Sequence, residues 1–162
     1  MTIELNMTLA EALVERKGLK ERLESLKQRL AVNARVQEGD APTETPETLL
    51  AQIDAAIADL ERLIVAINRT NLAAQLPGEE GWSLMEAIAR RDMLTLRQGI
   101  LQATIDVAQT TRERWAMTRN EVRSIAVVDV AAMQKEIDAL GKQRRELDMR
   151  LQAANWTVRL AA

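Results

Sequence analysis

The sequence predicts an all-α protein, an antiparallel four-helix bundle made of two duplicated helical hairpins. Apolar residues recur at alternating three- and four-residue steps in four long stretches, which is typical of helices that pack at shallow crossing angles. The start of the first stretch is repeated in the third, where [ST]-L-x-E-A-[LI]-x-x-R-x-x-L-x-x-R begins at Thr8 and again at Ser83. We therefore expect hairpin repeats over about residues 8–71 and 83–157, within a single domain spanning residues 1–162.

The first hairpin is predicted from clear helix signals. Thr8 is followed three residues later by Glu11, the pattern of a capping box, and the apolar periodicity continues to the region of Asn33. After a polar loop, Thr45 is expected to cap the second helix, with Pro46 in its first turn, where a missing N–H is tolerated. The expected core stripe of this second helix consists of Leu50, Ile53, Ile57, Leu60, Ile64 and Ile67.

The second hairpin begins with the same signals. Ser83 and Glu86 repeat the capping box, and Asp129 is expected to cap the fourth helix. Short extended segments are expected near residues 124–128 and 156–160, where β-branched or aromatic residues gather. A weaker echo of the duplication aligns Leu60, Ile64, Asn68 and Thr70 with Leu147, Leu151, Asn155 and Thr157.

The composition narrows the chemistry that the protein can perform. The 162 residues include no Cys and no His, which excludes disulfides, thiol nucleophiles, Cys/His zinc sites and imidazole acid–base catalysis. Only three aromatic residues occur, all Trp, so stacking platforms for bases or cofactors are sparse. We predict no catalytic residue, no metal site and no cofactor, and these absences disfavour an enzyme.

The sequence also predicts the protein's surroundings. No stretch has the apolar length of a membrane span, and the first residues lack the basic start and apolar centre of a signal peptide. The formal net charge of −2 offers no general attraction to nucleic acid or to an anionic membrane. We therefore expect a cytoplasmic protein that does not bind membranes.

Three arginines, Arg16, Arg91 and Arg144, fall on the predicted core stripes. Arg16 and Arg91 are equivalent in the repeat, so a twofold arrangement would bring them together. Guanidinium groups in a core need acceptors, and the candidate acceptors are Glu11, Glu86, Asp92 and Asp148. The favoured interpretation is a structural layer of salt bridges that fixes the register of the helices. The alternative is a pocket that binds an anion or a phosphate.

Other charged patterns are weaker. Glu21 and Glu24 form the Glu-x-x-Glu of some all-helical nucleotide pyrophosphatases, but no Glu-x-x-Asp follows, so a solvated helix face is expected instead. Basic residues cluster at Arg112, Arg114, Arg119 and Arg123, and again at Lys142, Arg144 and Arg145. Interleaved acidic residues dilute both clusters, which disfavours a nucleic-acid interface without excluding one.

Four stretches carry a resemblance to a known family: TLAEALVERKGLKERLESLKQRL, NARVQEGDAP, SLMEAIARRDML and VDVAAMQKEIDAL…RRELDMRLQAANW. Together they resemble a family of small, uncharacterised bacterial helical proteins that is labelled "septicolysin". The resemblance extends from about Thr8 to Trp156, implies a helical fold and offers no catalytic residues. The label suggests a pore-forming cytolysin. Because the chain has neither the size, the β-rich pattern nor the Trp-rich segment of cholesterol-dependent cytolysins, we expect no cytolytic activity.

The predicted function is that of a non-enzymatic, self-associating helical bundle, a structural or interaction module. A homo-oligomer is expected because two helices carry a second apolar stripe that one bundle does not cover. Its residues are Leu49, Leu63 and Ala66 on the second helix and Ile100 and Val107 on the third. The alternative is a binder of a small anion, a nucleotide or RNA, using arginines in the core or at an overhanging end of the third helix.

Overall fold

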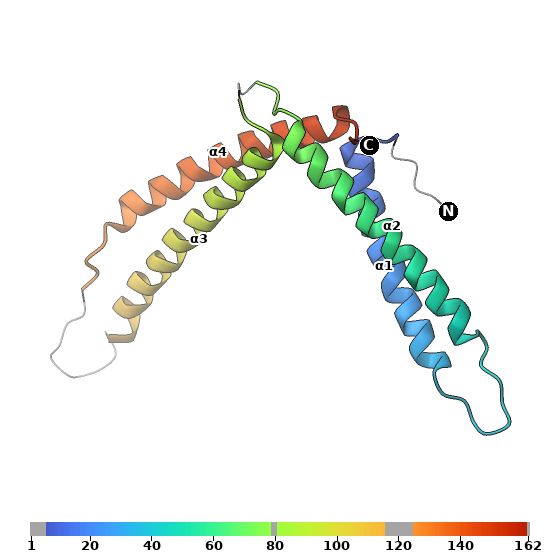
Figure 1. The fold of residues 1–162 in the computed structure, drawn as a ribbon. Helices are drawn as coiled ribbons and strands as arrows, with labels where there is room; N and C mark the ends of the chain where they lie inside the picture. Colours follow the sequence, from blue (N-terminus) through green and yellow to red (C-terminus); the bar gives the residue numbers. More distant parts are fainter. Residues whose placement is uncertain (1–5, 79–80, 116–124, 162) are drawn as a thin grey trace. The chain divides into compact units, whose positions relative to one another are not determined.

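Four long helices make up the protein (Figure 1). The computed structural model describes residues 6–78, 81–115 and 125–161, and these residues contain no β-strand. The helices are α1 (Leu9–Asn33), α2 (Pro46–Ala73), α3 (Leu84–Trp115) and α4 (Val130–Thr157). The predicted fold class, an all-α fold of four long helices, is confirmed for the described residues.

The chain forms two compact units. One consists of Met1–Leu84 together with Gln152–Ala162, and the other of Met85–Leu151. In the first unit α1 and α2 lie side by side as an antiparallel pair (Figure 1). In the second unit α3 and α4 are also antiparallel, because Arg97 contacts Glu136 whereas the earlier Arg91 contacts the later Asp148. The single domain over residues 1–162 and the duplication of the hairpins stay predictions.

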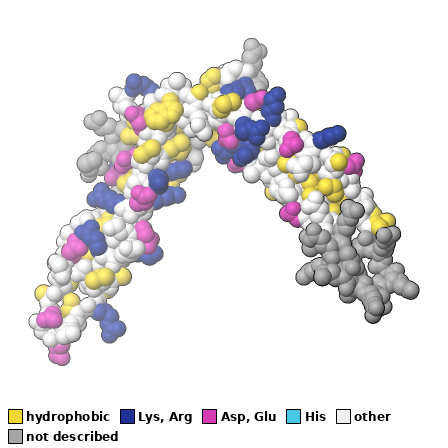
Figure 2. All heavy atoms as spheres, turned by 180° about the vertical axis from the view of Figure 1, so that it is seen from behind, with side chains coloured by type: hydrophobic (Ala, Val, Ile, Leu, Met, Phe, Trp, Pro, Cys, Tyr) yellow, Lys and Arg dark blue, Asp and Glu magenta, His cyan; other side chains and the backbone are white. Residues whose placement is uncertain are grey.

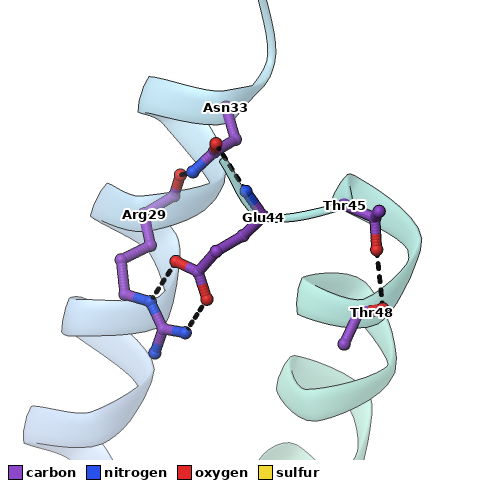
Figure 3. A network of polar contacts seen from close by, with 5 residues as sticks. All are labelled: Arg29, Asn33, Glu44, Thr45 and Thr48. Carbon is purple, nitrogen blue, oxygen red and sulfur yellow. Dashed lines mark hydrogen bonds and ion pairs between the residues drawn. The ribbon is translucent and has the colours of Figure 1, made fainter. Parts of the chain in front are cut away.

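The predicted helix starts are largely confirmed. Thr8 and Glu11 form the capping box, with the Thr8 amide donating to Glu11 Oε2 at 2.7 Å and the Glu11 amide donating to Thr8 Oγ1 at 3.3 Å. Asp129 accepts from the Ala132 amide at 2.9 Å. The N-terminus of α2 differs from the prediction, because Thr45 precedes Pro46 but caps no amide. Its hydroxyl lies 2.6 Å from that of Thr48 instead (Figure 3).

The core stripe of α2 is only partly the one predicted, because Ile67 of that stripe is buried whereas its other members are half-buried or exposed. Leu49, Ala56, Leu63 and Thr70 recur every seven residues and are buried, Leu49 and Leu63 completely. Of the predicted stripe, Leu50 and Ile57 are about half exposed, at 47% and 50%. Both sets have helical spacing, and the small Ala56 and Ala66 on the buried side allow close helix packing, which favours that side. Leu49, Leu63 and Ala66 are therefore unavailable to a partner, and their part of the oligomer argument is wrong.

The C-terminal segment closes the first unit. Arg159 and Thr8 form an isolated antiparallel β-bridge, with the Leu9 amide donating to Val158 O at 2.8 Å. The Ala161 amide donates to the buried Thr70 hydroxyl at 2.8 Å. The extended segment predicted near residues 156–160 is only partly present, because Trp156 and Thr157 still belong to α4 and the non-helical segment begins at Val158. Near 124–128, residues 125–128 have no helix or strand, and residue 124 lies outside the described residues.

Candidate functional site

The structure ties Arg91 to carboxylates from two helices. Its Nε and Nη2 donate to Asp92 Oδ1 at 3.0 and 2.8 Å, and its Nη1 lies 3.7 Å from Asp148 Oδ1 on α4. The Arg91 side chain is about one-third exposed, so it lies at the edge of the α3–α4 contact rather than deep within it. The predicted pairing of Arg91 with carboxylates is therefore present. These carboxylates occupy the guanidinium where an anion would otherwise bind.

The other predicted site residues have separate surroundings. Arg16 is half-buried on α1 in the first unit, and its side chain makes no ion pair with any described residue. Arg144 is half-buried on α4, and its Nε is buried without a hydrogen-bond partner in the described part of the chain. Glu11 belongs to the capping box of α1. Its carboxylate accepts hydrogen bonds from Thr8, mainly from the backbone amide and secondly from the side-chain hydroxyl, and these hold the pKa of Glu11 below its usual value. Glu86 is exposed on α3.

Further polar contacts lie along the middle of the α3–α4 pair. Arg97 Nε donates to Glu136 Oε1 at 2.7 Å, and Gln98 Nε2 donates to the Ile137 carbonyl at 3.0 Å. The Gln98 side chain lies against the buried Gly141, since a Cβ added to this glycine would be only 3.0 Å from Gln98 Nε2. These contacts bind fixed residues of α3 to fixed residues of α4, and they therefore specify the register of the pair.

A polar network that sequence reasoning missed closes the loop of the first hairpin (Figure 3). Arg29 binds the Glu44 carboxylate with two nitrogens, and its Nε lies 2.8 Å from Glu44 Oε2. The buried Asn33 accepts from the Glu44 amide at 3.1 Å and donates to the Arg29 carbonyl at 2.9 Å. The Arg29 hydrogen bonds hold the pKa of Glu44 below its usual value. The available signal was an Asn at the last turn of a predicted helix, which side-chain capping favours.

The weaker charged patterns are surface features where they are described. Glu24 pairs with Lys27 at 3.3 Å and Glu21 with Lys17 at 3.7 Å, on an exposed face of α1. No group of three or more Asp, Glu, His or Cys in the described part of the chain is placed to hold a metal ion. The side chains of Arg112, Arg114, Arg119 and Arg123 lie outside the described residues.

An exposed apolar face runs along α3. Its six residues recur at alternating four- and three-residue steps and are all exposed: Ala89, Met93, Leu96, Ile100, Ala103 and Val107. The four larger side chains are 54–67% exposed, whereas Leu94, Leu101 and Ile105 on the other side of the helix are buried. This set is called the α3 apolar face below. It contains Ile100 and Val107 of the predicted second stripe.

A second apolar surface lies in the first unit. It is a shallow groove of about 430 Å³ between α1 and α2, lined by Leu23, Leu30, Ile53 and Ile57. Lys20, Glu24 and Lys27 also line it. Figure 2 shows how hydrophobic side chains reach the surface among charged ones on one face of the molecule. No helix in the described part of the chain is long and apolar enough to cross a membrane.

These features define the class of the protein: an all-α chain of two antiparallel helical hairpins with exposed apolar surfaces. A family model described as a family of unknown function (DUF6847) matches residues 16–160, and the chain belongs to this family. A comparison with curated proteins finds no match. A crystal structure described as a functionally unknown conserved protein from Corynebacterium diphtheriae is similar, with 32% identity and a TM-score of 0.86. That similarity covers 96% of this chain and 99% of the other. Neither description carries the septicolysin label.

Proposed function

We propose that the protein is a non-enzymatic, self-associating helical module that acts in the cytoplasm by joining further copies of itself. The α3 apolar face carries this proposal. Exposed apolar residues are ordinary when scattered, but a contiguous face with the spacing of a coiled coil is typical of a surface that binds another helix. The groove between α1 and α2 supports the same kind of role.

A second copy of the chain is the partner that the proposal requires. Closed symmetric homodimers are the commonest assemblies of soluble proteins, and one exposed face per copy is sufficient for a twofold interface. The surrounding charges are of mixed sign, with Arg90, Asp92 and Arg97 beside the face, which suits a partner with the same mixture. These mixed charges would not attract a strongly acidic or a strongly basic partner.

The test is the molar mass of the full-length chain in solution. Multi-angle light scattering at increasing micromolar concentrations should give a mass above the 18.1 kDa of one chain, because mass action populates the assembly. A mass that stays at 18.1 kDa over the whole range would contradict the proposal.

A second candidate is a binder of a small anion, a nucleotide or RNA. It is favoured by one observation, the buried Nε of Arg144 without a partner in the described residues, since a buried donor left unpaired is unfavourable. Isothermal titration with inorganic phosphate and with a nucleoside triphosphate tests it. Binding that Arg144→Met abolishes and Arg145→Met retains would replace self-association as the leading function.

A further inference from the structure

We infer that two copies of the chain pair through the α3 apolar face, with their α3 helices parallel and in register. The inference rests on the proposed self-association and specifies its surface and orientation. The face spans residues 89–107, about 27 Å of helix at 1.5 Å per residue. Its alternating steps are those of the a and d positions of a heptad, with Met93, Ile100 and Val107 at a.

The charges beside the face select the orientation. With this assignment the e positions include Arg90 and Arg97, and the g positions include Asp92 and Asp106. In a parallel pair each g residue faces the e residue five positions later on the other helix. Asp92 of one copy would then face Arg97 of the second copy, twice over because of the twofold symmetry.

The antiparallel arrangement is disfavoured by the same residues. Antiparallel helices bring e positions opposite e positions and g opposite g. With a residues packed against d residues, Ile100 would lie opposite Leu96 of the second copy. Arg97 would then face its own equivalent, and Asp92 would face Asp106. These like-charge contacts oppose association, so the charges favour the parallel pair.

The side chains that would meet across the interface are available in the single chain. Arg97 is 62% exposed and Asp92 55% exposed as side chains. In the single chain Arg97 pairs with Glu136 at 2.7 Å and Asp92 with Arg91 at 2.8 Å, so the contact across the interface would add a second partner to each of these exposed side chains. Gly99 stands at a g position with open space around its Cα, so it offers no obstacle to a neighbouring helix.

Cysteine crosslinking tests the orientation, because the chain contains no native Cys. Ala89→Cys and Ala103→Cys place a thiol at d positions, where residues of the same number meet only in the parallel pair. A short bis-maleimide should therefore link each variant to itself. Ala139→Cys, an exposed alanine on α4, is the matched control and should give no covalent dimer. In an antiparallel pair neither Ala89→Cys nor Ala103→Cys would link to itself, whereas a mixture of Met93→Cys and Ala103→Cys would give a covalent mixed dimer. That result would overturn the parallel orientation.

A charged substitution tests the surface itself. Ile100→Glu should weaken dimerisation at least about tenfold, since it places two carboxylates at the centre of the interface. Val32→Glu, at an exposed valine of the first unit, should leave the dimer unchanged. An oligomer that survives Ile100→Glu and forms no crosslink at residues 89 and 103 would overturn this inference and leave the proposed self-association intact. A wild-type chain that is monomeric at every concentration would overturn both.

Discussion

The two hairpins hold their helices together in different ways. In the α1–α2 pair the buried residues along the helices are mainly apolar, among them Leu19, Leu26 and Leu63, and the polar network lies at the loop end. In the α3–α4 pair polar contacts interrupt the middle of the interface, where Gln98 and Arg97 bind residues of α4. The comparison indicates that different interactions stabilise the two hairpins. The first hairpin depends on apolar burial, whereas the second uses polar contacts for register and leaves an apolar face exposed.

The largest expected effect separates the two apolar stripes of α2. Leu63→Ala should lower the free energy of unfolding by about 3 kcal/mol, because a completely buried leucine is lost and a cavity remains. Ile57→Ala, at a half-exposed position one residue beyond the buried Ala56, should lower it by about 1 kcal/mol or less. Urea denaturation followed by circular dichroism measures both. Equal losses of stability in the two variants would contradict the difference in burial between the two stripes.

The polar contacts of the two hairpins should also differ in how much they contribute to stability. Asn33→Ala should destabilise the protein by about 1–2 kcal/mol, because the Glu44 amide and the Arg29 carbonyl lose a buried partner. Arg91→Met should change the stability by less than about 1 kcal/mol, since Asp92 and Asp148 are exposed enough to be hydrated when the arginine is removed. Denaturant midpoints of both variants provide the comparison. A larger loss for Arg91→Met would mean that the polar contacts dominate the second hairpin.

Glycine substitutions sharpen the comparison between helix and loop. Gly18→Ala in α1 and Gly99→Ala in α3 should each raise the stability by about 0.5–1 kcal/mol, because a helical alanine is favoured and nothing lies within 4 Å of the added Cβ. Gly39→Ala in the first loop is the opposing control and should destabilise, since Gly39 has a φ of +97°. Thermal melts of the three variants give the signs. A destabilising Gly18→Ala would contradict the open surroundings that the structure assigns to it.

The smallest effect concerns pH and the loop network. The pKa of Glu44 is lowered in the folded chain by its hydrogen bonds to Arg29, so the carboxylate contributes stability above the pKa of the unfolded glutamate. That contribution is lost as the pH falls through the lower, folded-state pKa. The stability difference between the wild type and Glu44→Gln should therefore be present at neutral pH and shrink in acid. A difference that is constant from neutral to acidic pH would contradict the assigned pair.

The sequence predicted the fold class and most element boundaries because those depend on local signals. Thr8 with Glu11 and Asp129 before α4 are capping patterns that can be read within four residues. The repeat pattern is matched by burial in its first part, since Leu9 and Leu84, and likewise Leu19 and Leu94, are buried. The duplication as a whole stays a prediction, and superposition of residues 8–71 on 83–157 is its test.

The sequence could not decide which stripe of α2 faces the core. Leu49 and Leu50 are adjacent leucines, each starting a series with helical spacing, and only contact with α1 selects between them. The carboxylate partners of the arginines could not be predicted for the same reason. Arg91 finds its carboxylates, but Arg16 pairs with none of the described residues, and the pairing of Arg29 with Glu44 depends on how a twelve-residue loop folds back. Such non-local contacts leave no periodic trace in the sequence.

Sedimentation equilibrium of the wild-type chain beside Ile100→Glu tests the central claim, that the exposed face of α3 joins copies of the protein. At the higher concentrations the wild type should approach twice the 18.1 kDa mass of one chain. The variant should remain near 18.1 kDa under the same conditions. A wild type that sediments as a single chain throughout, or a variant that associates as strongly as the wild type, would contradict the claim.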